Sequence, residues 1–205
     1  MDQKQYHHGD LKNSLIQAGM EVLAEAGLNA LSLRGVASRA GVSHSAPYAH
    51  FKDKQDLIVA ISTEGFRRLA GDIRAAIDST HDDMSRRLIE VGWAYVQFAI
   101  RNNALFKLMF SGLLEDGTPH HEFVEISQGS FLLLVQLVTE CQQAGVLRQG
   151  PPDILAVSLW SLVHGFVSLL LEKQISHTIL DSTSLKSLMC QTLEQIAQIR
   201  LNPSV

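Results

Sequence analysis

The 205-residue chain contains few of the residues that mark several large classes of protein. Its two cysteines, Cys141 and Cys190, have no CxxC partner. A disulfide framework and a thiolate zinc site are therefore not expected, and a reducing cytoplasm is the predicted location. Only five prolines and a hydrophobic content of 46% exclude a disordered or collagen-like chain. The first residues, Met1–Lys4, lack the basic and then apolar pattern of a signal peptide.

The sequence also lacks a long uninterrupted hydrophobic run. Its longest apolar stretch, Val157–Leu171, is interrupted by Ser158, Ser161, His164 and Ser168. We interpret this stretch as too polar and too short to cross a bilayer, and no membrane partner is predicted.

A large excess of positive charge is absent as well. Residues 1–70 carry eight Lys and Arg against seven Asp and Glu, and residues 71–205 carry nine against fourteen. A protein that coats nucleic acid without regard to sequence would be basic throughout. Any contact with DNA is therefore expected to use a small surface in the amino-terminal part.

The apolar residues that are present recur at helical spacing along the whole chain, and no strand-like alternation occurs. One stripe runs from Leu11 to Ala26, a short one from Leu33 to Ala40, and a third short helix is expected to end near Phe51. Five or six longer helices follow. The pattern predicts an all-α fold, with a three-helix domain at residues 1–55 and a helical bundle at residues 56–205.

Residues 32–54 have the pattern of a helix-turn-helix. Such a unit needs a small residue where its helices cross, a residue that tolerates positive φ in the turn, and an apolar residue directly after it. Ala37, Gly41 and Val42 meet these needs. The second helix then presents polar and ring-bearing donors suited to phosphate oxygens and base edges, namely Ser43, His44, Ser45, Tyr48 and His50. Lys54 adds a cation at the start of the next helix.

The string from Tyr48 to Leu57, Tyr-x-His-Phe-x-x-Lys-x-x-Leu, resembles the DNA-binding domain of TetR-family transcriptional regulators. The carboxyl-terminal part is similar to the branch named for a Trp-His-Gly signature, through residues 93–99, residues 105–110 and the group Trp160, His164 and Gly165. The resemblance implies phosphate contacts from Tyr48, His50 and Lys54, with support from Ser32. It implies base reading near His44 and Ser45, where Pro47 and Ala49 depart from many relatives.

The resemblance also implies an effector pocket in residues 56–205 that would take a small, largely apolar molecule. Large side chains distributed over several helices are what such a site is built from, although each one alone is also an ordinary core residue. The candidates are Trp93, Phe98, Phe106, Met109, Phe110, Phe131, Trp160 and His164.

The last two predicted helices are apolar on more than one side, so several of their faces must be covered. The resemblance implies that they form a four-helix interface with a second copy of the chain, and internal core is the competing interpretation. The predicted interface residues are Leu162, Gly165, Phe166, Leu169, Leu188, Leu193 and Ile196.

The sequence therefore predicts a homodimeric transcriptional regulator, a ligand-responsive repressor of a palindromic operator. No metal ligand set, cofactor motif or catalytic pair occurs at a workable spacing, so neither a cofactor nor an enzyme activity is predicted. Two other interpretations stay open: a helical-bundle enzyme, and a ligand-independent interaction or DNA-architectural module. The sequence names neither the effector nor the operator.

Overall fold

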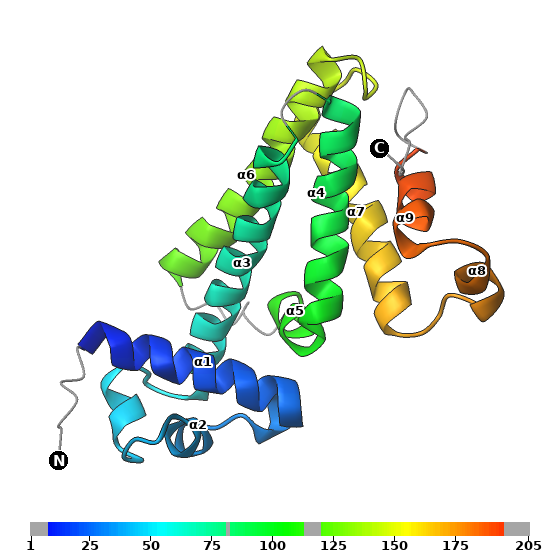
Figure 1. Ribbon diagram of the computed structural model, residues 1–205. Helices are drawn as coiled ribbons and strands as arrows, with labels where there is room; N and C mark the ends of the chain where they lie inside the picture. Colours follow the sequence, from blue (N-terminus) through cyan, green and yellow to red (C-terminus); the bar gives the residue numbers. More distant parts are fainter. Residues whose placement is uncertain (1–7, 81–82, 113–119, 195–205) are drawn as a thin grey trace. The chain divides into compact units, whose positions relative to one another are not determined.

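The computed structural model describes residues 8–80, 83–112 and 120–194, and all its regular elements there are helices (Figure 1). The predicted all-α class is therefore confirmed. These residues pack as two compact units. Of the described residues, the first contains 8–67, 102–112 and 120–127, and the second contains 68–80, 83–101 and 128–194.

The first unit begins with α1 (His8–Ala26), η1 (Leu28–Ala30) and α2 (Leu33–Ala40) and continues through η2 (Ala46–Ala49). It also holds the first part of α3 (Lys54–Asp78), all of α5 (Asn103–Met109) and the first residues of α6 (His121–Gln143). Helix α1 packs against α2 and α5. The core of this unit contains fully buried side chains from each part, including Leu15, Leu23, Leu31, Val36, Leu57 and Ile61.

Two capping residues give α2 its predicted limits. The Ser32 hydroxyl accepts a hydrogen bond from the Gly35 amide at 3.1 Å, which satisfies one of the donors left free at a helix start. Gly41 has φ 70°, in the left-handed region that glycine adopts without a steric penalty. These two residues limit α2 to Leu33–Ala40, the stripe that the sequence predicted.

The segment after Gly41 differs from the predicted third α-helix. It forms only the short 3-10 helix η2, with Pro47 in its first turn. Proline has no amide hydrogen to donate, so it fits at a helix start and adds nothing to an α-helical ladder. Its ring is buried, while Tyr48 and Ala49 remain exposed.

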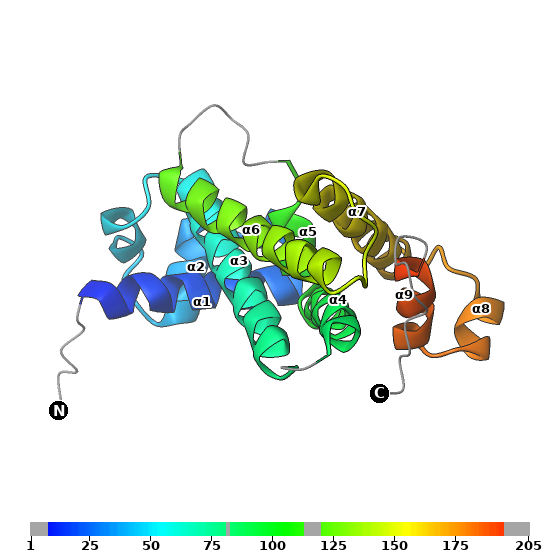
Figure 2. The ribbon, with the colours of Figure 1, turned by 90° about the horizontal axis from the view of Figure 1, so that it is seen from above.

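The second unit contains the end of α3 and the helices α4 (Met84–Arg101), α7 (Pro152–Leu171), α8 (His177–Ser182) and α9 (Leu185–Leu193), with the rest of α6. Helix α7 packs against α4 and α9, and Figures 1 and 2 both show α9 beside α7. A largely buried ion pair of 3.2 Å joins Arg87 of α4 to Glu140 of α6. A second pair of 2.8 Å joins Lys186 of α9 to Glu90 of α4.

The division by packing differs from the predicted division by function between residues 55 and 56. The start of α3 packs on α1: a Cβ atom added at Gly19 would lie only 2.7 Å from the Ile61 Cδ1 atom. The apolar residues of α3 therefore help to form the core of the amino-terminal unit. Helix α8 has no counterpart among the predicted helices, because its six residues give too short a pattern.

Candidate nucleic-acid interface and ligand site

The predicted DNA-contacting residues lie on the surface of the first unit around η2. Ser32, Ser43, His44, Ser45 and Lys54 are exposed. The hydroxyls of Ser43 and Ser45 are 3.1 Å apart, and the Ser38 hydroxyl lies 3.1 Å from His44 Nε2. These bonds orient short polar side chains without burying them. A duplex could therefore exchange them for bonds to phosphates and base edges.

Tyr48 and Phe51 occupy opposite environments. The Tyr48 side chain is 55% exposed, whereas Phe51 is 2% exposed. Exposure of a large ring is costly in water, and it leaves the Tyr48 hydroxyl accessible to a partner. Phe51 is therefore a core residue, and Tyr48 stays available for the predicted phosphate contact.

Lys54 and His50 are held more tightly than the sequence suggests. The Lys54 Nζ atom donates to the Leu28 carbonyl at 3.1 Å, which ties the start of α3 to η1. The His50 Nε2 atom is buried and has no hydrogen-bond partner among the described residues. That atom cannot reach a phosphate while it is buried, so its predicted contact requires the other ring edge or a turn of the ring.

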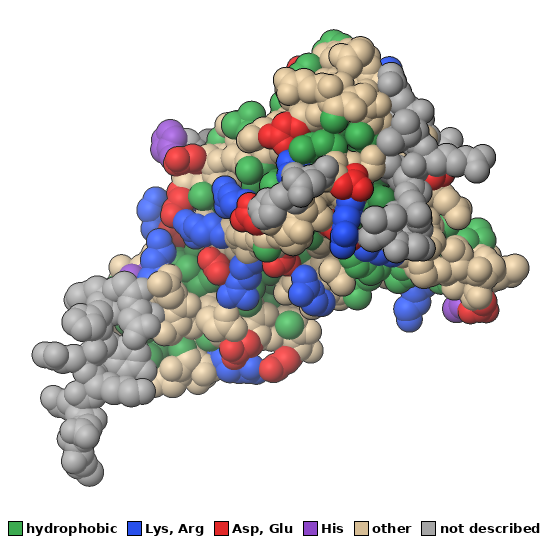
Figure 3. Space-filling view, turned by 45° about the horizontal axis from the view of Figure 1, so that its top comes forward, with side chains coloured by type: hydrophobic (Ala, Val, Ile, Leu, Met, Phe, Trp, Pro, Cys, Tyr) green, Lys and Arg blue, Asp and Glu red, His purple; other side chains and the backbone are tan. Residues whose placement is uncertain are grey.

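Charge is distributed in agreement with a limited DNA surface. Basic and acidic side chains are intermixed on the face of the molecule shown in Figure 3. Arg39, on α2, forms an ion pair with Glu25 and lies 3.6 Å from Glu21. Acidic partners thus offset this cation near the helix-turn-helix. The predicted DNA contacts around η2 would therefore depend on individual side chains more than on bulk charge.

The predicted effector residues are divided between the two units. Phe106, Met109 and Phe110 belong to the first, where the rings of Phe106 and Phe110 pack with centroids 4.9 Å apart. Met109 lies close against Gly65 of α3, and both Phe106 and Met109 are buried. These residues complete the core beneath α5. The other five candidates belong to the second unit.

A hydrogen-bonded group in the second unit joins three polar side chains of α4 and α7. The Trp160 Nε1 group donates to the Tyr95 hydroxyl at 3.1 Å, and this hydroxyl lies 2.7 Å from His164 Nδ1. Tyr95 can accept the indole proton and donate its own proton to a neutral imidazole. This hydrogen bond gives His164 a partner within the second unit.

Burial sets the protonation of this group. Burial raises the pKa of Tyr95 far above its ordinary value, so the hydroxyl keeps its proton. Burial also lowers the pKa of His164, so the neutral ring is favoured. Phe131 covers Trp160 from α6, with ring centroids 6.1 Å apart. Sequence reasoning did not select Tyr95, because a tyrosine at an apolar position of α4 gives no signal of its partners.

The predicted dimer residues fall into two groups. Leu169 is 51% exposed, and Leu162, Gly165 and Leu188 are half-buried. Phe166 and Leu193, in contrast, are only 6% and 1% exposed within the single chain. Packing within the single chain, the competing interpretation, accounts for the burial of these two side chains, and their place in a dimer interface stays a prediction. Ile196 lies outside the described residues.

Helix α7 presents an unusually apolar surface. Ile154, Val157, Trp160 and Leu169 are all exposed large apolar residues. By length and composition α7 is the one described helix that could cross a membrane, with 33% of its apolar stretch buried, and core helices pass the same test. Ser158 and Ser168 donate to the Ile154 and His164 carbonyls one turn earlier, so their hydroxyls do not interrupt the helix. One helix of this kind does not by itself indicate a membrane protein, and the absence of a membrane partner stays a prediction.

Possible metal ligands are not clustered in the part of the chain that the structure describes. No group of three His, Cys, Asp or Glu side chains lies close enough there to hold an ion. Cys141 and Cys190 are buried free thiols, and burial raises the pKa of the Cys190 thiol. Burial likewise raises the Cys141 thiol pKa to about 12.

Known proteins resemble both parts of the chain. Residues 15–61 match the family of bacterial regulatory proteins of the tetR type, and residues 88–193 match the tetracyclin repressor-like carboxyl-terminal domain. A structure of a protein with unknown function from Rhodococcus sp. RHA1 is 30% identical, with a TM-score of 0.80 over 96% of this chain and all of that one.

Two curated relatives are regulators. The HTH-type transcriptional regulator YvkB of Bacillus subtilis is 22% identical over 74% of this chain and 78% of its own length. The nicotine-responsive transcriptional repressor HdnoR of Paenarthrobacter nicotinovorans is 29% identical to this chain. The matched region covers 55% of this chain and 58% of that repressor. The chain thus joins a helix-turn-helix of the tetR type, at residues 15–61, to a carboxyl-terminal domain of the same family, at residues 88–193. The chain belongs to the TetR family of transcriptional regulators.

Proposed function

We propose that this regulator is a homodimeric repressor that binds a palindromic operator and releases it when a small, largely apolar effector binds the second unit. The observation that carries the proposal is the surface around η2. There a capped α2, a glycine turn and a buried Pro47 leave Ser43, His44, Ser45 and Tyr48 exposed. An exposed tyrosine among short polar side chains is suited to a phosphate backbone and a groove.

Two copies of this surface would read two half-sites in successive major grooves. The apolar face of α7 supports a dimer, because a second copy would remove Leu169 and Val157 from water. An effector would then act by favouring a dimer whose two surfaces no longer match the operator spacing. Helix α3 is the candidate lever, since it is continuous from Lys54 to Asp78 and contributes to both units.

The group around Tyr95 supports the position of the effector site. Trp160 and Phe131 offer an apolar surface, and His164 offers a polar group beside them. Such a combination of apolar walls and one polar contact is typical of small-molecule sites. HdnoR is named as nicotine-responsive, and FadR of Bacillus halodurans, a structure 18% identical to this chain, is named as a fatty acid degradation regulator. For this chain we propose only the chemical class of the effector, a small and largely apolar molecule.

Selection from a random DNA pool tests the proposal. The full-length protein should enrich a palindrome, and Tyr48→Ala should weaken binding to it by several-fold or more, as expected for a lost hydrogen bond of about 1 kcal/mol. Lys54→Ala should lower the slope of log affinity against log salt by about one if it loses one phosphate contact. Lys107→Ala, at an exposed position of α5, is the matched control. If no sequence is enriched, or if both variants bind like the wild type, the surface around η2 does not bind DNA.

A further inference from the structure

The two hydrogen bonds at the Tyr95 oxygen in the second unit have a preferred direction. The Trp160 Nε1 group can only donate, so the Tyr95 oxygen accepts its proton at 3.1 Å. The same oxygen lies 2.7 Å from His164 Nδ1, a short distance for a hydrogen bond. Because the oxygen already accepts from the indole, the favoured arrangement is that Tyr95 donates its own proton to Nδ1.

This direction fixes the tautomer of His164. A neutral imidazole holds one proton, and a nitrogen that accepts a hydrogen bond does not carry it. Burial keeps the ring neutral, because it lowers the pKa of His164. Burial also raises the pKa of Tyr95, so the hydroxyl keeps the proton that it donates. The proton of His164 therefore lies on Nε2, and that edge of the ring is a hydrogen-bond donor.

Aromatic rings surround this donor. The rings of Trp160 and His164 meet edge to face with centroids 5.9 Å apart, and Phe131 of α6 lies 6.1 Å from Trp160. Tyr95 is 8% exposed, whereas Trp160 is 36% exposed and both Phe131 and His164 are half-buried. The tyrosine is thus fixed inside the unit, while the other three rings keep surface that a ligand can cover.

The part of α6 that carries Phe131 also keeps apolar surface. Residues 131–135 are five consecutive apolar residues, and none of them is buried; Leu132 is 62% exposed. Successive residues of a helix point to different sides, so this turn of α6 is incompletely packed on every side. Apolar area is therefore available next to Trp160 for the body of a ligand.

A neutral acceptor matches the His164 donor better than an anion does. A carboxylate beside Nε2 would favour the protonated ring. That ring carries a proton on Nδ1 as well, so it could not accept from Tyr95, and the Tyr95 oxygen would face two donors. The carbonyl oxygen of a ketone or ester accepts the Nε2 proton without this cost.

We propose that Tyr95 is a positioning residue that holds the proton of His164 on Nε2, so that His164 donates a hydrogen bond to the carbonyl oxygen of a neutral, largely apolar ketone or ester. The body of this effector would lie against Trp160 and Phe131. The inference rests on the proposed function, because it specifies the effector of the same site.

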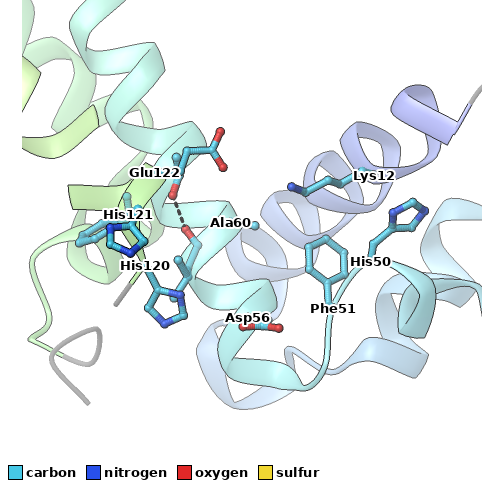
Figure 4. Close-up of a pocket in the computed structure, with 11 residues that line it drawn as sticks. Lys12, His50, Phe51, Asp56, Ala60, His120, His121 and Glu122 are labelled. Carbon is cyan, nitrogen blue, oxygen red and sulfur yellow. Dashed lines mark hydrogen bonds between the residues drawn. The ribbon is translucent and has the colours of Figure 1, made fainter. Parts of the chain in front are cut away.

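Two histidines of the first unit serve as references for the test. His50 and His120 line a cavity there together with Lys12 (Figure 4). Their Nε2 atoms are buried and make no hydrogen bond to any described residue, so no partner at that nitrogen sets their tautomer. A change that acts through Tyr95 should therefore leave their NMR signals unaltered.

Histidine-ring NMR spectra of the full-length protein test the tautomer, because protonated and unprotonated ring nitrogens differ in chemical shift. At about pH 8, where the ring is neutral, His164 should show a single tautomer with Nδ1 unprotonated. Tyr95→Phe should give a mixture of both tautomers, whereas Trp160→Phe, which keeps the tyrosine hydroxyl, should retain the single one. A mixture or a protonated Nδ1 in the wild type overturns the proposal, and so does an unchanged single tautomer in Tyr95→Phe.

Titration calorimetry with acetophenone tests the effector class without DNA. Ethylbenzene has the same apolar body without the oxygen, and benzoate has a charged acceptor. Wild-type protein should bind acetophenone at least about fivefold more tightly than either, as expected for one hydrogen bond. Tyr95→Phe should reduce the advantage over ethylbenzene, and Ser182→Ala, which removes an exposed hydroxyl of α8, should keep it. No binding of acetophenone, or equal binding of either comparison molecule, overturns the proposal.

The enriched operator separates this inference from the proposed function. Acetophenone should weaken operator binding by wild-type protein, and binding of acetophenone with unchanged operator affinity overturns the assignment of this group to the effector site. Absence of any operator binding counts against the proposed function alone, because the NMR and calorimetric results do not involve DNA. Operator binding together with mixed tautomers of His164 counts against this inference alone.

Discussion

At Tyr95, a single hydroxyl group connects two side chains of another helix. It accepts from Trp160 and lies 2.7 Å from His164 Nδ1, so the neutral imidazole can accept its proton. Protonated His164 would have no lone pair there, and the hydroxyl would then face two donors. The burial that lowers the pKa of His164 therefore also preserves the hydrogen-bonded group.

Replacement of His164 by glutamine should change how stability depends on pH. The folded-state pKa of His164 lies below its ordinary value of 6.5, so its contribution is complete above that pH and is lost as pH falls below it. As the pH falls from about 7.5 to about 5.5, the free energy of unfolding of the wild type should decrease relative to that of His164→Gln. Urea unfolding measures this difference. A constant difference across that range, or the same change in the exposed-site control His177→Gln, would contradict the assignment.

At the scale of elements, capping residues decide where a helix begins and ends, and small residues decide how closely two helices pack. Ser32 and Gly41 limit α2, and Gly65 lets α3 pack closely on α5. A Cβ atom added at Gly65 would lie 2.6 Å from Met109 Sδ, whereas one added at Gly71 meets nothing within 4 Å. The same residue type thus has different roles two turns apart on one helix.

The two glycines of α3 form a matched pair for a stability test. Gly65→Ala and Gly71→Ala both gain the helix propensity of alanine, about 1 kcal/mol. Only Gly65→Ala also crowds Met109 and Leu105, at a cost of about 1–3 kcal/mol. Gly65→Ala should therefore be less stable than Gly71→Ala by about that amount, as measured by denaturant unfolding. Equal stability would show that Met109 moves aside without cost.

The cap of α2 allows stability and DNA binding to be separated. Ser32→Ala removes the acceptor of the Gly35 amide and should cost about 1 kcal/mol. Ser32→Asp keeps an acceptor and should restore stability, but its charge would repel a nearby phosphate. The melting temperature of Ser32→Asp should therefore be close to that of the wild type and above that of Ser32→Ala. Both variants should bind the operator more weakly than the wild type. Full affinity of Ser32→Asp would place Ser32 away from the DNA.

At the scale of the whole molecule, the described residues include several apolar side chains of α7 that are exposed. Leu169, Trp160 and Val157 of α7 are exposed, and α9 covers another side of the same helix. Several large apolar side chains exposed on one helix indicate a candidate interaction site. A second copy is the partner that the TetR family provides.

A charge on this face should prevent dimer formation. Leu169→Glu would bury a carboxylate without a partner in the proposed interface, so the dimer should dissociate at a concentration at least about tenfold higher. Sedimentation of the wild type and the variant measures the change. Gln97→Glu, at an exposed position of α4, is the control for added charge. A wild-type monomer, or an unchanged dimer in Leu169→Glu, would contradict the proposed interface.

The sequence by itself determined the helical class and the helix-turn-helix. Its periodicity, the Ser32 cap and the turn at Gly41 act through neighbouring residues, and their effects are local. The string from Tyr48 to Leu57 likewise identified the family, because its residues are close together in the chain.

Only the tertiary structure decided which distant side chains meet. It joined Tyr95 to Trp160 and His164, and it buried Phe166 and Leu193 inside the chain. It also placed Lys12, His50 and His120 around one cavity. Contacts between residues far apart in sequence depend on how helices pack, and an apolar pattern shows only that a face is covered. It does not show which helix covers that face.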